Sequence, residues 1–247
     1  MAYQSVFQRY EIKYLITEAQ KELILQAMRP FMAADRYGLT TIQNLYLDTD
    51  TYRLIRRSID KPVYKEKLRL RSYGQATPGD PVFVELKKKY KGVVYKRRVA
   101  LPEETALQWL TGQAPCHQKG QIVDEIDYFR GFYAPLRPMV FLAYDRQAWY
   151  SLNGDGFRVT FDENILFRQE DISLSAPAWG TALLEPGKTL MEIKCAGAIP
   201  LWMCRALSQG GIRKTSFSKY GTAYTDHIFP SLQGGKQNDK FDLSKCI

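Results

Sequence analysis

Alternation of polar and apolar residues with a period of two is the dominant pattern of residues 64–98. Because the side chains of a strand point to opposite faces in turn, this pattern predicts strands at 64–73, 82–89 and 93–101. A turn rich in glycine and proline separates the first two strands, and Tyr90-Lys91-Gly92 joins the last two as a hairpin. One face of these strands is apolar. The charged residues that share the other face are Lys67, Arg69, Arg71, Glu85, Lys87, Lys89, Lys96 and Arg98.

Such a charged face has two interpretations. An antiparallel sheet with one face packed and the other in water produces the same alternation. Alternatively, the cationic faces of several strands look at one another across a groove or barrel. Like charges opposite one another are destabilising, so that arrangement requires a polyanion between them. The second interpretation is favoured, because nearly every predicted strand carries Lys, Arg or Glu on one face.

The rest of the chain contributes further strands and several helices. Strands are predicted at 9–16, 42–48, 139–149, 157–162 and 189–194, and helices at 52–57, 102–110, 122–133, 201–207 and toward His227. A helix also starts at Thr17, which forms a capping box with Gln20, and ends near Pro30. We therefore expect an α+β fold, an eight-stranded antiparallel β-barrel (tunnel) with helices packed outside. Residues 1–230 would form this domain, and residues 231–247 a polar, mobile tail.

Composition narrows the class of ligand. The 247 residues are 45% hydrophobic, enough for a sizeable core, and the net charge of +9 points to an acidic partner. Four cysteines without metal-ligand spacing and two histidines argue against zinc and favour a cytoplasmic protein with reduced thiols. No apolar stretch is long enough for a transmembrane segment, so any membrane involvement would come through a partner protein. Nucleic acid is disfavoured, because the cations alternate within strands instead of forming a stripe with stacking aromatics.

Six motifs, in order, span almost all of residues 5–228. They are Arg9-Tyr10-Glu11-Ile12-Lys13-Tyr14, Tyr46-Leu47-Asp48-Thr49, Lys67-Leu68-Arg69-Leu70-Arg71-Ser72-Tyr73-Gly74, Val84-Glu85-Leu86-Lys87, Glu192-Ile193-Lys194 and Phe217-Ser218-Lys219-Tyr220. In these motifs the chain resembles the polyphosphate polymerase (vacuolar transporter chaperone, VTC) domain of the triphosphate tunnel metalloenzyme, or CYTH-like, superfamily. The resemblance implies an eight-stranded tunnel that binds ATP or another nucleoside triphosphate, or a polyphosphate chain, with a divalent metal, Mn²⁺ or Mg²⁺.

The resemblance also implies roles for individual residues. The catalytic cations would be Lys13, Arg69, Arg71, Lys87, Arg158 and Lys194. Further phosphate ligands would be Arg57, Lys67, Lys96, Arg146, Lys214, Ser218 and Lys219, with Arg56 and Ser58 competing with Arg57 for the aligned place. The metal ligands would be Glu192, Glu85 and Glu11.

Two positions depart from the patterns of related proteins. The tunnel triphosphatases begin with Glu-x-Glu-x-Lys, but Arg9 holds the place of the first glutamate here. This removes a metal carboxylate and favours the polymerase branch over the hydrolases. Many polymerase relatives have Lys-Phe-Ser-Lys near the C-terminus, whereas this chain has Ser216 in the first place, with Lys214 as a substitute two residues away.

The sequence thus favours a polymerase that passes the terminal phosphoryl group of ATP to a polyphosphate chain. Two alternatives stay open: a tunnel triphosphatase, and a non-catalytic module that binds polyphosphate. Single residues also have purely structural interpretations. Glu11 with Lys13 fits a cross-strand ion pair, Glu192 fits a counterion of a neighbouring lysine, and Asp48 and Ser218 fit a turn and a helix cap. Asp162 fits a strand end better than a ligand.

Overall fold

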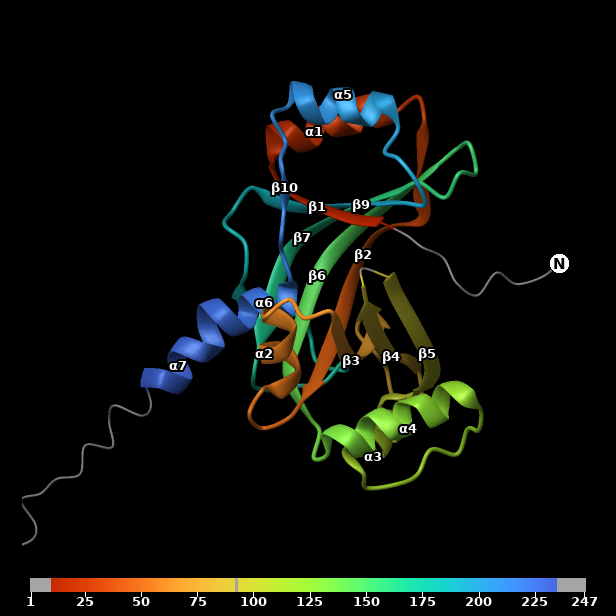
Figure 1. Ribbon diagram of the computed structural model, residues 1–247, viewed down its shortest axis with the longest axis vertical. Helices are drawn as coiled ribbons and strands as arrows, with labels where there is room; N and C mark the ends of the chain where they lie inside the picture. Colours follow the sequence, from red (N-terminus) through yellow and green to blue (C-terminus); the bar gives the residue numbers. More distant parts are fainter. Residues whose placement is uncertain (1–9, 92, 235–247) are drawn as a thin grey trace, which may run out of the picture.

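The computed structural model of the protein describes residues 10–91 and 93–234 (Figure 1). The strands are β1 (Tyr10–Thr17), β2 (Met32–Asp48), β3 (Tyr64–Tyr73), β4 (Pro81–Tyr90), β5 (Val93–Pro102), β6 (Arg137–Ser151), β7 (Arg158–Arg168), β8 (Thr181–Ala182), β9 (Lys188–Cys195) and β10 (Lys214–Thr215). The helices are α1 (Glu18–Met28), α2 (Arg53–Ile59), α3 (Glu103–Thr111), α4 (Gln121–Tyr133), α5 (Leu201–Gln209), α6 (Lys219–Ala223), the π-helical η1 (Tyr224–Ile228) and α7 (Phe229–Gly234).

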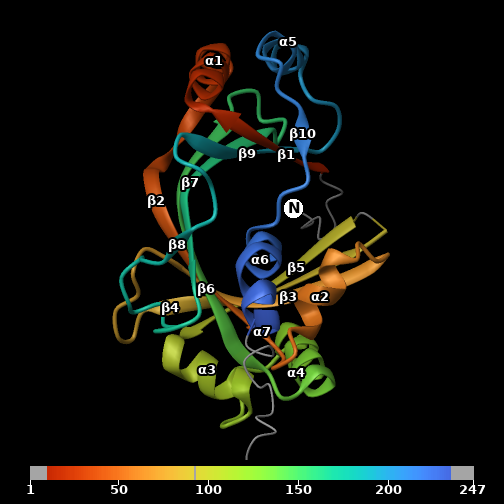
Figure 2. The ribbon, with the colours of Figure 1, turned by 90° about the vertical axis from the view of Figure 1, so that its left-hand side faces the viewer.

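The strands form one antiparallel sheet in the order β10-β1-β9-β7-β6-β2-β3-β4-β5, with β8 paired to β7. The long strands β2 and β6 are the middle of this sheet, and register shifts between Ala34 and Leu39 and between Tyr46 and Leu47 interrupt their pairing. Bulges of this kind bend strands. The wing of β3, β4 and β5 is joined to one end of β2, and the wing of β9 and β1 to one end of β7, so the sheet curves round on itself (Figure 2).

The expectation of a closed eight-stranded barrel is wrong in two respects. The sheet has ten strands, and in the described residues its end strands β5 and β10 do not pair with each other, so the sheet stays open. The alternation pattern reports which side chains share a face, but it carries no information on which strand edges meet. The two extra strands, β8 and β10, are two residues each and too short to show any period.

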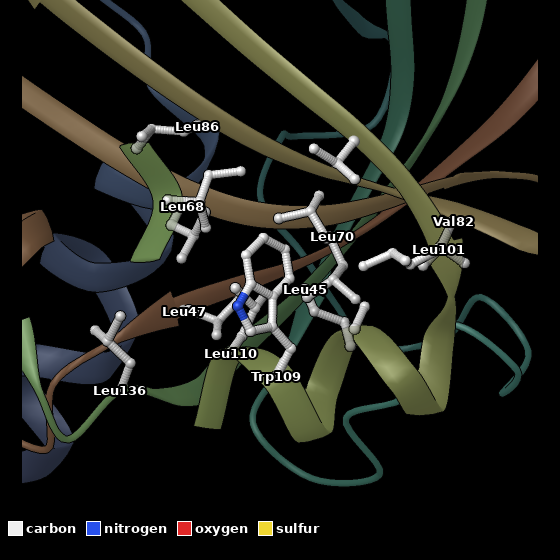
Figure 3. Close-up of a cluster of buried hydrophobic side chains, with 14 of the residues drawn as sticks. Leu45, Leu47, Leu68, Leu70, Val82, Leu86, Leu101, Trp109, Leu110 and Leu136 are labelled. Atoms are coloured by element: carbon white, nitrogen blue, oxygen red, sulfur yellow. The ribbon is translucent and has the colours of Figure 1, made fainter. Parts of the chain in front are cut away.

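Three apolar clusters hold the fold together. The outer face of β3, β4 and β5 packs on α3 and α4, with Leu68, Leu70 and Trp109 fully buried (Figure 3). A second cluster lies between β1, β7 and β9 and the helices α1 and α5. Burial of one leucine stabilises the fold by about 1.5–3 kcal/mol. These faces confirm the predicted alternation, because the leucines between the charged residues of β3 are all inside.

The third cluster places helices on the other side of the sheet. Side chains of α6 and η1, among them Tyr220 and Tyr224, pack on Tyr46, Leu142 and Tyr144 of β2 and β6. Figure 2 shows α6 lying within the curve of the sheet. The expectation that helices pack only outside is therefore corrected: α1, α3, α4 and α5 cover the outer face, whereas α6 and η1 fill one end of the concave face.

Most element positions agree with the sequence pattern. The capping box of Thr17 and Gln20 starts α1, and β3 has the predicted bounds. Strands β2 and β7 are longer than expected, because pairing with β6 extends them through segments that lack alternation. The residues expected to form a tail begin inside α7, which ends at Gly234, while Arg9 and residues 235–247 lie outside the described residues. Within the described chain, no helix is long and apolar enough to span a membrane.

Candidate functional site

Many charged residues of the strands lie on the concave face of the sheet, and the strand register arranges them in rows. In one wing the rows are Arg69–Glu85–Arg98 and Lys67–Lys87–Lys96, across β3, β4 and β5. In the other wing they are Lys13–Glu192–Thr160 and Glu11–Lys194–Arg158, across β1, β9 and β7. The prediction that these side chains share faces is confirmed by this pairing.

Glu85 is the centre of the first group, the Glu85 cluster, whose four cations are Arg69, Arg71, Lys96 and Arg98. Its side chain is 1% exposed. Arg69 Nη2 lies 2.8 Å from Glu85 Oε2, and Lys96 Nζ lies 2.6 Å from Oε1. Arg98 Nε donates to Oε1 at 2.9 Å, and Arg71 Nε lies 3.8 Å from Oε2. Both carboxylate oxygens are thus occupied by cations.

Electrostatics within the Glu85 cluster leaves an excess of positive charge. Burial opposes the ionisation of Glu85, but Arg69 and Arg71 outweigh burial and hold its pKa well below the ordinary range. Burial lowers the pKa of Lys96 to about 8, although the neighbouring Glu85 carboxylate acts in the opposite direction. Four cations face a single ionised carboxylate, so an anionic ligand can be accommodated here.

The second group, the Asp162–Glu192 cluster, contains Asp162, Glu192, Lys13, Arg146, Lys194 and Lys219. Arg146 forms a two-pronged contact with Asp162, at 2.6 Å from Nε to Oδ1 and 2.7 Å from Nη2 to Oδ2. Lys219 Nζ also donates to Asp162 Oδ2. Lys194 Nζ lies 2.7 Å from Glu192 Oε1, and Lys13 Nζ lies 3.8 Å from Oε2.

Both carboxylates of this cluster are buried and ionised. Burial acts against the charge of Asp162, but Lys219 and Arg146 lower its pKa to about 2. Lys194 and Lys13 likewise overcome burial and hold the pKa of Glu192 below its ordinary range. Asp162 therefore orders two cations of the site, a role that its position near a predicted strand end did not reveal.

Two tyrosines that the sequence interpretation missed contact these groups, and Tyr144 connects them. Arg71 Nη2 donates to the Tyr144 hydroxyl at 3.2 Å, and Lys219 Nζ lies 4.2 Å from the centre of the Tyr144 ring. The Tyr46 hydroxyl accepts a hydrogen bond from Arg69 Nη1 at 2.9 Å. Burial favours the neutral phenol of Tyr46, but Arg69 and Lys67 outweigh burial and lower its pKa to about 7. Tyr144 could have been identified from its position in the sequence, since it precedes Arg146 by two residues and therefore shares its strand face.

Contacts of the two wings, with each other and with residues 217–218, show that the charged faces meet. Lys87 Nζ of β4 lies 3.1 Å from Glu11 Oε2 of β1, and Lys67 Nζ of β3 donates to Ser218 Oγ at 3.2 Å. Lys13 Nζ donates to the carbonyl of Phe217 at 2.8 Å. Burial, with help from the like charges of Lys13 and Lys87, lowers the pKa of Lys67 to about 8. Cations from both wings thus face a common space, as the second interpretation of the pattern predicted.

Four of the expected phosphate ligands lie outside the two clusters. Arg57 lies on α2, where it lines a separate hollow of about 300 Å³ with Arg53 and Arg56. Arg158 is exposed at the start of β7, and Lys214 is exposed on β10. Ser218 caps α6 by accepting from the amide of Gly221 at 3.2 Å, and it also reaches Lys67.

Other structural interpretations are resolved by the contacts. Asp48 accepts hydrogen bonds from the amides of Leu54 and Ile55 at 2.8 and 2.9 Å, which orders the start of α2. Glu192 neutralises two lysines, and Glu11 pairs with Lys87 instead of Lys13.

A divalent metal fits this site only together with phosphate. Residues 10–91 and 93–234 hold no group of three His, Cys, Asp or Glu side chains able to bind an ion. Glu192 Oε2 lies 3.8 Å from Lys13 Nζ, and Glu11 precedes Lys13 by two residues on β1, so two carboxylates lie near one lysine. Carboxylate oxygens suit Mg²⁺ or Mn²⁺, with phosphate oxygens completing the coordination. Glu85 fits a metal poorly, since Arg69 and Lys96 lie within 2.8 Å of its two oxygens, whereas Glu192 has a cation that close, at 2.7 Å, on Oε1 alone and Lys13 lies 3.8 Å from its Oε2.

The geometry suits phosphate chemistry. Guanidinium groups of Arg69, Arg71 and Arg146 offer paired donors to phosphate oxygens, and the lysines add point charges. In the absence of a ligand, the carboxylate partners of these cations hold them in place and partly neutralise their charge. The arrangement can therefore bind several linked phosphate groups along the concave face.

Comparisons with known proteins agree with this fold. A family model described as VTC domain matches residues 8–227. A proposed adenylate cyclase from Vibrio parahaemolyticus is 12% identical with a TM-score of 0.52, over 90% of this chain and 100% of that chain. A second, from Bacillus halodurans, is 14% identical with a TM-score of 0.52, over 87% and 94%. A proposed adenylyl cyclase from Hippeastrum, described as having a dominant triphosphatase activity, is 18% identical with a TM-score of 0.53, over 90% and 94%. No curated protein matches the chain.

Proposed function

Because the chain belongs to the VTC domain family, we propose that it is a polyphosphate polymerase that uses ATP as the phosphoryl donor. The observation that carries the proposal is the meeting of cations from both wings. Lys87 of one wing contacts Glu11 of the other, and Lys67 and Lys13, one from each wing, contact the neighbouring residues Ser218 and Phe217. A chain of phosphates would lie along this face, where it supplies the negative charge that the cations lack. We place the reaction in the cytoplasm, where ATP is available.

In this reaction an oxygen at the end of the polyphosphate chain attacks the γ-phosphorus of ATP. A new P–O bond forms, the bond from the γ-phosphorus to the β–γ bridging oxygen breaks, and ADP leaves. Catalysis of such a transfer consists mostly of positioning and charge stabilisation, because charge is spread over the non-bridging oxygens in the transition state. No protein nucleophile is required.

The residues of the two clusters divide this work. Arg69, Arg71 and Arg146 would orient phosphates by paired hydrogen bonds, whereas Lys13, Lys67, Lys87, Lys96, Lys194 and Lys219 would neutralise charge. Glu192 and Glu11 would hold Mn²⁺ or Mg²⁺ together with phosphate oxygens. When bound, the ion supplies further neutralisation of the transferred phosphoryl group. Tyr144 would fix the relative position of Arg71 and the Asp162–Glu192 cluster through its hydroxyl and ring.

The test is incubation of the purified protein with ATP and Mn²⁺, followed by separation of the products by chain length. A ladder of polyphosphate with release of ADP is the expected result. Glu192→Gln should lower metal-dependent turnover by at least about tenfold, while ATP binding persists. Glu163→Gln is the matched control. Glu163 lies two residues after Phe161 on the outer side of β7, away from the site, and pairs with Lys21 at 2.6 Å. Neither polymer nor free phosphate, under conditions where ATP binds, would remove the enzymatic proposal.

Two other functions are each favoured by one observation. The description of the Hippeastrum protein favours a triphosphatase, which would yield orthophosphate without a ladder. Ser216, which stands where many polymerase relatives carry lysine, favours a non-catalytic module that binds polyphosphate. Such a module would bind the chain at least as tightly in Glu192→Gln as in the wild type, because the variant frees Lys13 and Lys194 from their carboxylate, and it would turn over no ATP.

A further inference from the structure

A basic hollow lies beside the central site, at the end of β3 and β4. Its volume is about 530 Å³, and its lining includes Lys61, Lys65, Lys89, Lys91 and Ser216, which together form what we call the lysine hollow. None of the described residues that line it is acidic. A volume of this size lies within the range of small-molecule sites. The positive charge of the lysine hollow therefore lacks a counterion in its own wall.

The lysine hollow continues the rows of cations in the central site. Lys65 pairs with Lys89 across β3 and β4, one step beyond the pair of Lys67 and Lys87 on the same face. Alternate residues of a strand are about 7 Å apart, so the two lysine pairs form successive steps of one ladder. The causes of the lowered pKa of Lys65 are burial first and then the like charges of Lys89, Lys61 and Lys87. The ladder is thus close enough for its charges to interact.

The kind of cation differs between the two places. The central site combines lysines with the forked guanidinium groups of Arg69, Arg71 and Arg146, which fix the position of a phosphate. The lysine hollow has lysines alone, whose flexible side chains act as point charges and tolerate a range of ligand positions. Lys89 and Lys91 are also exposed. Such a site suits a repeating anion that must shift by one unit, and it offers little to a nucleoside.

We propose that the lysine hollow is an outer subsite that holds phosphate units of a polyphosphate chain beyond those bound in the central site. The inference rests on the proposed function in that the ligand is polyphosphate. It adds that the protein selects long chains over short ones, because only a long chain can reach the central site and the lysine hollow together.

The test compares the dissociation constants of tripolyphosphate and of a long, size-fractionated polyphosphate, measured by calorimetry without metal or ATP. Lys65→Gln/Lys89→Gln should raise the Kd of the long chain by about tenfold, with less than a twofold change for tripolyphosphate. The control Lys119→Gln/Arg205→Gln removes the same charge at exposed positions outside the lysine hollow and should change neither Kd. Val63→Lys adds a cation to the lining and should tighten binding of the long chain only.

Several outcomes would overturn the inference. Equal weakening of both ligands would make the lysine hollow a part of the central site, and weakening of neither would remove it as a phosphate site. In a separate titration of the same variants with ATP, a loss of ATP binding with both polyphosphate constants unchanged would assign the lysine hollow to the nucleoside. Failure of the proposed function gives a different result: length-dependent binding would persist, but ATP would yield no polymer.

Discussion

Replacement of Glu85 by glutamine tests whether the concave face needs an internal anion. The change keeps the size of the side chain and removes the one carboxylate that faces Arg69, Arg71, Lys96 and Arg98. Removal of one partner from a buried ion pair costs about 3–5 kcal/mol, because the remaining charge stays buried and unpaired. Arg69 and Arg71 are 19% and 8% exposed, whereas Lys96 and Arg98 are 42% and 36% exposed and can turn toward water. We therefore expect Glu85→Gln to lower the free energy of unfolding by about 3 kcal/mol, at the low end of that range.

Unfolding in urea at neutral pH and low salt measures this loss, with and without tripolyphosphate. A ligand that binds only the folded state stabilises it by an amount set by its affinity. Because the phosphates replace the missing carboxylate, tripolyphosphate should stabilise Glu85→Gln by more than it stabilises the wild type. The added stabilisation should shrink with salt, since screening weakens the attraction of phosphate to the exposed Lys96 and Arg98.

Glu125→Gln is the matched control on the opposite side of the sheet. Glu125 lies 3.3 Å from Lys88 Nζ and 3.2 Å from Arg97 Nε, and its side chain is 23% exposed. Partly exposed pairs near the surface contribute about 0–1 kcal/mol, so the variant should lose little stability and respond to tripolyphosphate as the wild type does. If Glu85→Gln and Glu125→Gln gave the same loss and the same response to the ligand, the proposed role of Glu85 as a stand-in for phosphate would be refuted.

Three further predictions concern pH and packing. The pKa of Asp162 is about 2 in the folded chain against an ordinary 3.8, so its ionisation contributes about 2 kcal/mol to the free energy of unfolding above pH 4, and this contribution is lost as the pH falls toward 2. Acid unfolding of Asp162→Asn should lack that part of the pH dependence, and a profile equal to that of the wild type would contradict the prediction. Phosphate binding should raise the pKa of Lys67 from about 8, so the protein should take up a proton on binding near pH 8 and bind phosphate more weakly as the pH rises further. Calorimetry in buffers of different ionisation enthalpy measures this proton uptake, which Lys67→Met should diminish; equal uptake in both proteins would assign the proton to another group. Leu68→Ala removes a fully buried side chain between β3 and α3 and should lower the free energy of unfolding, measured in urea, by about 2–5 kcal/mol. The control Leu152→Ala, at a 60% exposed position, should change this free energy little, and comparable losses in the two variants would contradict the packing described.

Local features of the fold were predictable because local rules determine them. Strand β3 and the hairpin of β4 and β5 follow from alternation and turn residues, and the start of α1 follows from Thr17 and Gln20. Closure of the sheet was predicted wrongly, because it depends on which edges meet and on bends in β2 and β6 that no periodicity records. The position of α6 within the curve was missed for the same reason.

The site was predictable by face but not by partner. Alternation placed Lys67, Arg69 and Lys87 on the correct side, since it requires only a strand. It could not show that Glu85 would be enclosed by cations, nor that Asp162 would order Arg146 and Lys219, because these contacts join residues distant along the chain. Tyrosine counts as apolar in an alternation pattern, so the sequence did not identify Tyr46 and Tyr144 as residues of the site.

The most direct test of a phosphate site on the concave face is a crystal structure of the protein with tripolyphosphate and Mn²⁺. We expect phosphate groups in contact with Arg69, Lys67 and Lys13, from both wings of the sheet, and an anomalous manganese signal beside Glu192. Phosphate bound at the arginines of α2 or on the outer face, with the concave face free of ligand, would contradict this.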